Sequence, residues 1–324
     1  MKRASAVLLC AALAVGGCSQ PPSGGTAGAS RPPAASLLSG RAGRTDGPVL
    51  AVKVDNTASA HPQVGLDAAD VVYVEEVEGG LTRVAALYST SYPKAVGPVR
   101  SARISDIQLL RQYGSAGLVY SGSQRAMVDP LRRSGLKLLS LDGDVPGFRR
   151  AADRPAPYNV MANLTTLRER AAEGVSTPTA VGYRFGRAPA GGRAAAELTV
   201  RWPAARLRAT WSAGERRWLL SMDGRASRTP QGRRLGPTTL VVQRVQVVPS
   251  PYRDVNRKTT PDSRTVGSGT ALVLRDGRVY DARWSRPSDA AATTYTIGGA
   301  PAAIATARKG AYIAITCAVL LAKK

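Results

Sequence analysis

Histidine is nearly absent from this chain, because His61 is the only one among 324 residues. A zinc site built from three histidines is therefore excluded, and a Ser-His-Asp or Cys-His hydrolase would depend on His61 alone. The sequence also lacks a Gly-x-Ser-x-Gly elbow, a Walker A loop and a dinucleotide-binding glycine fingerprint. We therefore expect no metal and no nucleotide cofactor, and the residues do not favour conventional nucleophilic hydrolysis.

Long hydrophobic runs are also missing. The apolar runs at residues 4–15 and 313–322 are both shorter than the roughly 20 residues that span a bilayer. The first run follows two basic residues and ends in small residues before Cys18, a pattern typical of an export signal. Val15-Gly16-Gly17-Cys18 fits the bacterial lipobox, so we expect a signal peptide over residues 1–17 and lipidation of Cys18 on the outer face of the cytoplasmic membrane. The alternative is a secreted protein with a chance cysteine at this place.

The chain has too few cysteines for a disulfide to stabilise the fold. Cys10 would leave with the signal and Cys18 would be lipidated, so Cys317 alone would remain and no intramolecular disulfide would form. Residues 18–47 are rich in Ser, Gly, Ala and Pro, which predicts a flexible tether. Stability must then come from a hydrophobic core, and the rest of the chain is long enough for two domains of medium size.

Acidic residues are few: 22 Asp and Glu stand against 45 Lys and Arg, for a net charge of +23. A nucleic-acid partner is not expected, because the export signal directs the chain out of the cytoplasm. Most of the basic residues are Arg, and together with abundant Ala, Gly and Pro this is typical of a GC-rich genome. A basic C-terminal half would also suit a surface of anionic lipid or wall polymer.

Hydrophobic periodicity predicts an α/β (α+β) domain over residues 48–175. Ser101 is a plausible cap for one helix and Gly114 a natural stop. The strands are expected at 49–54 and 117–120, with a hairpin of 70–77 and 83–88, and the helices at 101–113, 124–133 and 163–173.

A smaller, mostly β domain is predicted over residues 190–306. Asp276-Gly277 is typical of a tight type I′ hairpin turn. The strand-like runs are 197–202, 207–212, 217–222, 239–248, 271–274 and 279–284.

Three carboxylates, those of Glu75, Glu76 and Glu78, fall within four positions at the end of a predicted strand. Because side chains alternate along a strand, Glu76 and Glu78 would project together. Such a pair can serve acid-base catalysis, hold a cation or bind an amine. The alternative is a solvated strand end with structural ion pairs.

Two arginines, Arg100 and Arg103, lie about one helical turn apart where a turn runs into a predicted helix. Their guanidinium groups would suit a carboxylate or phosphate, and the backbone N–H groups of a helix start also attract anions. The alternative is that one arginine pairs with a carboxylate of residues 75–78 and only joins two elements.

An ordered series of segments resembles the YerB-like bacterial lipoproteins. The series is VKVDN at 52–56, HPQVGL at 61–66, ADVVY at 69–73, EGGLTR at 78–83 and GPVRSAR at 97–103, with APYN at 156–159, VGSG at 266–269 and WSR at 284–286 farther along. The resemblance covers about residues 48–300. It implies an extracytoplasmic lipoprotein with an α/β part and a smaller β part, and it implies no activity, because the family is a domain of unknown function.

The end of the chain departs from this family. Family members end with a Gly followed by a Trp-containing strand, whereas residues 307–324 form an atypical tail without that pattern. An altered reading frame and a divergent final strand would both explain the departure.

These patterns favour a lipid-anchored cell-envelope protein that binds an anionic or zwitterionic ligand, such as a wall fragment, over an enzyme. One alternative is an enzyme acting on wall glycan, with Glu76 or Glu78 as acid/base and Asp55 as partner. Carboxylates about 5–9 Å apart across an open cleft would favour that enzyme, and carboxylates held by arginine would not. A docking scaffold for envelope proteins is the other alternative, and the oligomeric state is left open. The candidate ligand-binding residues are Asp55, Asn56, Glu75, Glu76, Glu78, Arg83, Arg100, Ser101 and Arg103.

Overall fold

The computed structural model describes residues 35–171, 173–178, 182, 184–303 and 311–316. The expected signal peptide, the lipidation site at Cys18 and the tether up to residue 34 lie outside the described residues. No described helix is long and apolar enough to cross a membrane.

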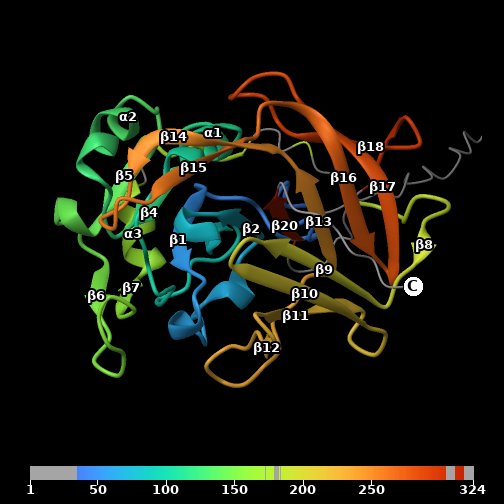
Figure 1. Ribbon diagram of the computed structural model, residues 1–324, viewed down its shortest axis with the longest axis horizontal. Helices are drawn as coiled ribbons and strands as arrows, with labels where there is room; N and C mark the ends of the chain where they lie inside the picture. Colours follow the sequence, from blue (N-terminus) through green and yellow to red (C-terminus); the bar gives the residue numbers. More distant parts are fainter. Residues whose placement is uncertain (1–34, 172, 179–181, 183, 304–310, 317–324) are drawn as a thin grey trace, which may run out of the picture. The chain divides into compact units, whose positions relative to one another are not determined.

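The N-terminal half is built around β1 (Leu50–Asp55), whose six residues are all buried. It pairs antiparallel with β3 (Thr82–Tyr88) and parallel with β4 (Gly117–Tyr120), so it is covered on both edges. The hairpin expected at 70–77 and 83–88 is present, because β2 (Val71–Glu76) pairs antiparallel with β3. The strands expected at 49–54 and 117–120 are also confirmed. β5 (Lys137–Ser140) extends the sheet parallel to β4 (Figure 1).

The helices are shorter than the sequence predicted. α1 (Ile104–Arg111) begins three residues after Ser101, so the assignment of Ser101 as its cap was wrong. Arg103 is the capping residue, because the carboxylate of Asp106 accepts a bond from its backbone N–H at 2.6 Å. Gly114, with φ of +72°, follows the helix as expected. The other helices are α2 (Val128–Arg132) and α3 (Leu164–Ala171), and short 3₁₀ turns are η1 (Ala58–Ala60), η2 (Leu66–Ala68), η3 (Glu78–Gly80), η4 (Arg125–Met127) and η5 (Leu141–Gly143).

One twelve-stranded sheet runs through both halves of the chain. Its order is β19-β18-β17-β16-β13-β20-β2-β3-β1-β4-β5, and β8 pairs with β17. β20 (Ala311–Thr316), within the atypical tail, lies parallel between β2 and β13 and joins the two halves. The C-terminal members are β8 (Arg193–Ala194), β13 (Thr239–Arg244), β16 (Gly267–Arg275), β17 (Arg278–Arg286), β18 (Thr294–Ile297) and β19 (Ala300–Pro301).

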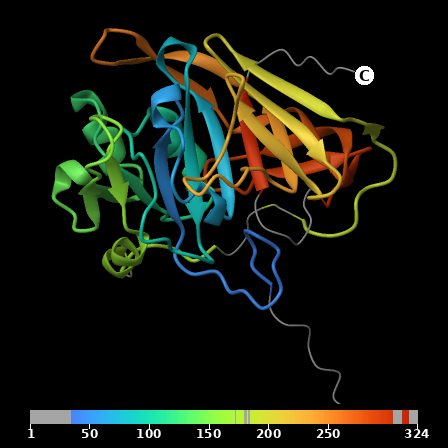
Figure 2. The same ribbon diagram turned by 90° about the horizontal axis from the view of Figure 1, so that it is seen from below.

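A second sheet of four strands packs against the larger one. Its strands alternate between buried and more exposed residues, and Trp218 on β11 is fully buried. In Figure 2 the yellow strands of this sheet cross over the orange and red strands of the larger sheet. The strands are β9 (Glu197–Trp202), β10 (Ala205–Ser212), β11 (Arg217–Met222) and β12 (Arg225–Ala226).

The strand expected over 239–248 divides at Val245 into β13 and β14 (Gln246–Arg253). Pro249 and Pro251 lack the N–H that an interior strand must donate, so β14 leaves the large sheet. It forms a two-stranded hairpin with β15 (Thr259–Arg264), and β15 packs on α1 (Figure 1). A second small hairpin joins β6 (Phe148–Arg150) and β7 (Val160–Ala162). The turn at Asp276-Gly277 has positive φ at both residues, as expected of type I′.

Residues 35–47 do not behave as the predicted flexible tether. Leu38 is fully buried in the same core cluster as Val71 and Leu109. The Ser36 hydroxyl donates to the Asp46 carboxylate at 2.8 Å, which closes the segment into a turn. Burial of Leu38 and the bond between Ser36 and Asp46 fix this segment against the core, although its composition is that of a linker.

Candidate functional site

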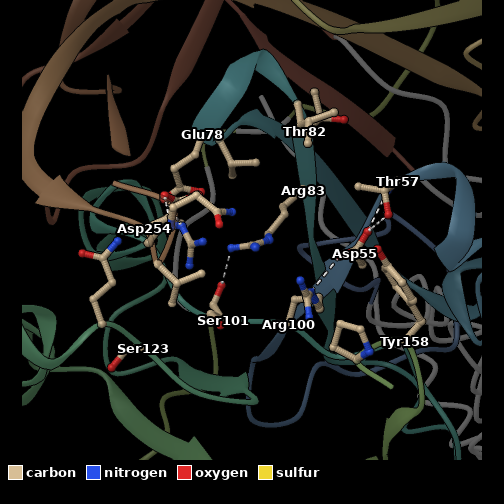
Figure 3. Close-up of a pocket in the computed structure, with 17 residues that line it drawn as sticks. Asp55, Thr57, Glu78, Thr82, Arg83, Arg100, Ser101, Ser123, Tyr158 and Asp254 are labelled. Carbon is tan, nitrogen blue, oxygen red and sulfur yellow. Dashed lines mark hydrogen bonds and ion pairs between the residues drawn. The ribbon is translucent and has the colours of Figure 1, made fainter. Parts of the chain in front are cut away.

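The carboxyl end of β1 opens into a pocket of about 510 Å³ (Figure 3). This volume lies within the roughly 300–1,000 Å³ that is usual for small-molecule sites. The walls come from the residues after β1, the turn between β2 and β3, the segment before α1, and the loops around residues 123 and 158. The tip of the β14–β15 hairpin, residues 254–256, adds a wall from the C-terminal half.

The pocket collects most of the candidate ligand-binding residues. Three of them lie elsewhere: Asn56 is buried and donates to the Thr82 hydroxyl at 2.8 Å, Glu75 lies in the core, and Glu76 is half-buried on β2 outside the pocket. The six that line it are Asp55, Glu78, Arg83, Arg100, Ser101 and Arg103.

The acidic and basic clusters meet in this pocket. The Nε atom of Arg100 lies 2.8 Å from Oδ2 of Asp55, and Nε of Arg103 lies 2.5 Å from Oε1 of Glu78. The Thr260 hydroxyl also donates to Glu78, at 2.6 Å. Burial alone would raise the pKa of Glu78, but the bond from Arg103, its charge and the Thr260 bond together hold that pKa below its usual value. The carboxylates of Asp55 and Glu78 are thus both held by arginine.

The expected pairing of Glu76 with Glu78 in one site was wrong. β2 ends at Glu76, and Glu78 already belongs to the 3₁₀ turn η3, so strand alternation no longer applies between them. Gly79 and Gly80 both have φ of +71°, which this tight turn requires. Glu78 faces the pocket and Glu76 does not line it. Within the described part of the chain, no three His, Cys, Asp or Glu side chains are grouped to hold a metal ion.

Arg83 is the pocket arginine that makes no ion pair with a described residue. Its side chain is buried, and among the described residues no carboxylate lies within 4.0 Å of its guanidinium. Its one hydrogen bond runs from Nη1 to the carbonyl of Ser101, at 3.3 Å. Burial and repulsion by Arg103 and Arg100 lower its pKa to about 10, although the charges of Glu78 and Asp55 partly oppose this shift. Figure 3 shows Arg83 extending across the centre of the cavity, so most of its five N–H donors are available there.

Behind the Arg103 wall lies a buried ionic triad that sequence reasoning missed. The Nζ atom of Lys53 lies 2.9 Å from Glu75 and 2.5 Å from Asp106, and all three side chains are buried. Asp106 also caps the backbone of Arg103, which links the triad to the pocket. The sequence did indicate such a triad, because Lys53 lies within the apolar strand β1 and a buried lysine needs carboxylate partners.

The triad gives stability a specific dependence on pH. Two carboxylates share one cation, and burial raises the pKa of Glu75 to about 7 despite the nearby Lys53. The folded protein therefore holds this proton more tightly than the unfolded chain, whose ordinary value is 4.5. Stability from this group is full below pH 4.5 and is lost as the pH rises through about 7.

Glu75→Gln keeps the shape of the protonated side chain and removes this titration. We expect the variant to exceed the wild type in free energy of unfolding at pH 8 by about 2–3 kcal/mol, with the gap closing toward pH 4.5. Urea unfolding at pH 5 and pH 8 measures this. Glu169→Gln, on the exposed face of α3, is the control. A gap of equal size at both pH values would show that Glu75 does not titrate as described.

Several pocket residues carried no signal in the sequence, because they come from separate loops and a distant hairpin. Tyr158 lies with its ring 5.7 Å from the Arg100 guanidinium carbon. Ser123 and Gln124 follow β4, and Thr57 donates to Asp55. Only the folded chain brings these residues to the end of β1.

Comparison with known proteins gives the family. The model of the DUF3048 N-terminal domain, a protein of unknown function, matches residues 37–177, and that of its C-terminal domain matches residues 198–308. These matches agree with an N-terminal part of mixed strands and helices and a mostly β C-terminal part, so the predicted fold class is confirmed.

A relative in Bacillus subtilis (strain 168), named "Putative lipoprotein YerB", is 32% identical over 122 residues. The match covers 38% of this chain and 37% of the relative. The crystal structure of YerB from Bacillus subtilis superposes with a TM-score of 0.74 at 19% identity, over 89% of this chain and 99% of that one. The structural match supports the fold alone, and the two family models together carry the assignment. This chain belongs to the DUF3048 family.

Proposed function

We propose that this protein is lipid-anchored through Cys18 to the outer face of the cytoplasmic membrane and binds a small anionic or zwitterionic envelope ligand in the pocket at the end of β1. The observation that carries the proposal is Arg83, a buried cation that makes no ion pair with any described carboxylate. A buried charge without a partner is costly to the fold, and such costs are found at functional sites. Arg100 and Arg103 add positive potential around it.

An acid group of the ligand would supply the ion-pair partner that Arg83 lacks. A carboxylate or phosphate accepts two parallel bonds from a guanidinium, and such charged pairs are stronger than neutral hydrogen bonds. A zwitterionic ligand would also find Asp55 and Glu78 on either side of the arginine (Figure 3). These carboxylates would face its ammonium group.

The two alternatives receive less support. A general acid needs a raised pKa, whereas that of Glu78 is lowered by Arg103, and Asp55 is held by Arg100. Glu76, whose pKa is raised by burial, does not line the pocket. A docking scaffold would require a large exposed apolar patch, and the described exposed large hydrophobics are Leu37, Leu81 and Val255.

Arg83→Gln tests the binding site. Thermal unfolding of the intact protein in detergent is followed with muropeptides, anionic lipid headgroups, polyphosphate or divalent metals. A probe at about one hundred times its dissociation constant should stabilise the wild type by about 2.7 kcal/mol, and the variant should lose this shift. Without a probe the variant should be at least as stable as the wild type, because an unpaired buried cation has been removed.

Arg125→Gln is the matched control, since Arg125 is exposed beside the pocket residue Gln124. It should keep the full shift. If Arg83→Gln unfolds at a much lower temperature without any probe, Arg83 is structural and the binding assignment is wrong. If no probe stabilises the wild type, the docking scaffold becomes the better explanation.

The anchor has its own test. The name of the Bacillus relative and the lipobox pattern support lipidation at Cys18. We expect Cys18→Ser to move the protein from the membrane fraction to the soluble fraction, because the acyl chains provide the attachment. Retention of the variant in washed membranes would contradict the assignment.

A further inference from the structure

One arginine of the pocket is free to pair with an acid group. The carboxylates of Asp55 and Glu78 form ion pairs with Arg100 and Arg103, so among the described lining residues Arg83 is the arginine without an ion pair. Asp254, on the hairpin tip, is engaged in its own turn, where it accepts bonds from the backbone N–H groups of residues 256 and 258 at 2.9 and 2.8 Å. One acid group of the ligand would pair with Arg83, and the described lining residues include no second arginine without an ion pair.

The rest of the pocket is rich in free hydroxyl groups. Within the part of the chain that the structure describes, the side-chain oxygens of Ser101, Ser123 and Tyr158 have no hydrogen-bond partner, and all three line the cavity. In Figure 3, Ser123 and Tyr158 lie on opposite sides of Arg83. A site with several polar groups to satisfy discriminates against a ligand that has none to offer. The ligand should therefore carry hydroxyl groups at more than one position.

One wall offers a flat apolar surface. The ring of Tyr158 is held by Arg100, whose guanidinium carbon lies 5.7 Å from the ring centre, and Pro157 lines the pocket beside it. Leu81 is partly exposed at the same cavity. A pyranose ring has an apolar C–H face and a rim of hydroxyl groups, so it can pack on the tyrosine while its rim meets the polar side chains.

The pocket lies away from the segment at residues 35–47. Residues 35–47 approach β1 at its amino end, where the N–H of Gly47 donates to the carbonyl of Ser89. The pocket lies at the carboxyl end of the same strand, at Asp55, about 17–20 Å farther along at strand rise. The site therefore lies at the opposite end of β1 from residues 35–47.

We infer that the ligand of this pocket is a sugar acid, a pyranose that carries one carboxylate, with Arg83 binding the carboxylate and Tyr158 and Ser123 binding the sugar. This inference rests on the proposed anion site and names its ligand class. Arg83 determines charge selectivity, and Tyr158 and Ser123 determine selectivity for the ring.

Calorimetric titration of the intact protein in detergent separates binding of the carboxylate from binding of the sugar ring. The probes are N-acetylmuramic acid and glucuronic acid as sugar acids, N-acetylglucosamine as a neutral sugar and lactate as an acid without a ring. We expect at least one of the sugar acids to bind at least tenfold more tightly than lactate, and the neutral sugar to show no measurable binding. Tyr158→Leu and Ser123→Ala should each weaken that sugar acid and leave lactate unchanged, whereas Arg83→Gln should abolish binding of both.

Each of the other results would contradict either the sugar-acid inference, the role of Arg83 or both. If lactate binds as tightly as the sugar acids, the anion site stands and the sugar inference is wrong. If the neutral sugar binds as tightly as the sugar acids, the sugar subsite stands and the role of Arg83 is wrong. If neither the sugar acids nor lactate bind, both inferences fail. Thermal unfolding of Tyr158→Leu without probes must match the wild type, and Tyr158→Phe then shows whether the ring alone suffices.

Discussion

Lys53→Met is expected to lower the free energy of unfolding by about 3–5 kcal/mol, the usual loss when one partner of a buried ion pair is removed. The substitution leaves the carboxylates of Glu75 and Asp106 buried without their only cation. One of them must then take up a proton or remain charged in the core. A reduced midpoint in urea unfolding, or loss of soluble protein, measures the effect.

Two further variants keep this prediction falsifiable. Lys94→Met removes an exposed lysine and should change stability by less than about 0.5 kcal/mol. The triple variant Lys53→Met, Glu75→Gln and Asp106→Asn removes every charge of the triad and should recover more than half of the loss, because neutral replacements of buried ions are often tolerated. If the triple variant is as unstable as Lys53→Met, packing by the lysine stem, and not its charge, explains the loss.

Arg286→Met is expected to have a similar cost, about 4 kcal/mol, for a different reason. The Arg286 guanidinium is fully buried at the end of β17, where it donates to the carbonyls of Ala291, Gln108 and Asp289 and to the Thr265 hydroxyl. Gln108 lies on α1, so this side chain ties the C-terminal half to the helix beside the pocket. Methionine would remove all four bonds, including the buried one to the Thr265 hydroxyl.

The same strand offers the control. Arg283 lies on β17 three positions earlier and is exposed, so Arg283→Met should be nearly neutral. Arg286→Lys should be intermediate, since an ammonium group cannot reproduce the planar fork. Thermal unfolding of the three variants tests this prediction. If Arg286→Met and Arg283→Met lower the stability equally, Arg286 has no special role.

Local structure was predictable wherever a local pattern determines it. The alternation along β9, β10 and β11 and the apolar run of β1 placed these strands within a few residues. Asp276-Gly277 has positive φ at both residues, which the dipeptide itself favours. The start of α1 was misplaced because Ser101 is a good capping residue by type, while the side chain of Asp106 fixes the start at Arg103.

The site was predictable only in part. The order of charged residues pointed to Asp55, Glu78, Arg100 and Arg103, and the structure brings these into one pocket. Which carboxylate pairs with which arginine depends on distances in the folded chain. The absence of an ion pair at Arg83 could therefore not be predicted from the sequence. The contributions of Tyr158 and of the β14–β15 hairpin tip depend on long-range packing. No periodicity or spacing in the sequence encodes that packing.

The place of β20 has a consequence for biogenesis. β2 and β13 are both made early relative to Ala311–Thr316, yet each has one edge that only this later strand covers. During folding, these edges stay open until the last described strand pairs with them, and open edges are templates for pairing with other chains. A molecule that loses the segment after residue 310 would expose both edges permanently. Quality control in the cell would then meet an aggregation-prone protein whose pocket still has its full set of residues.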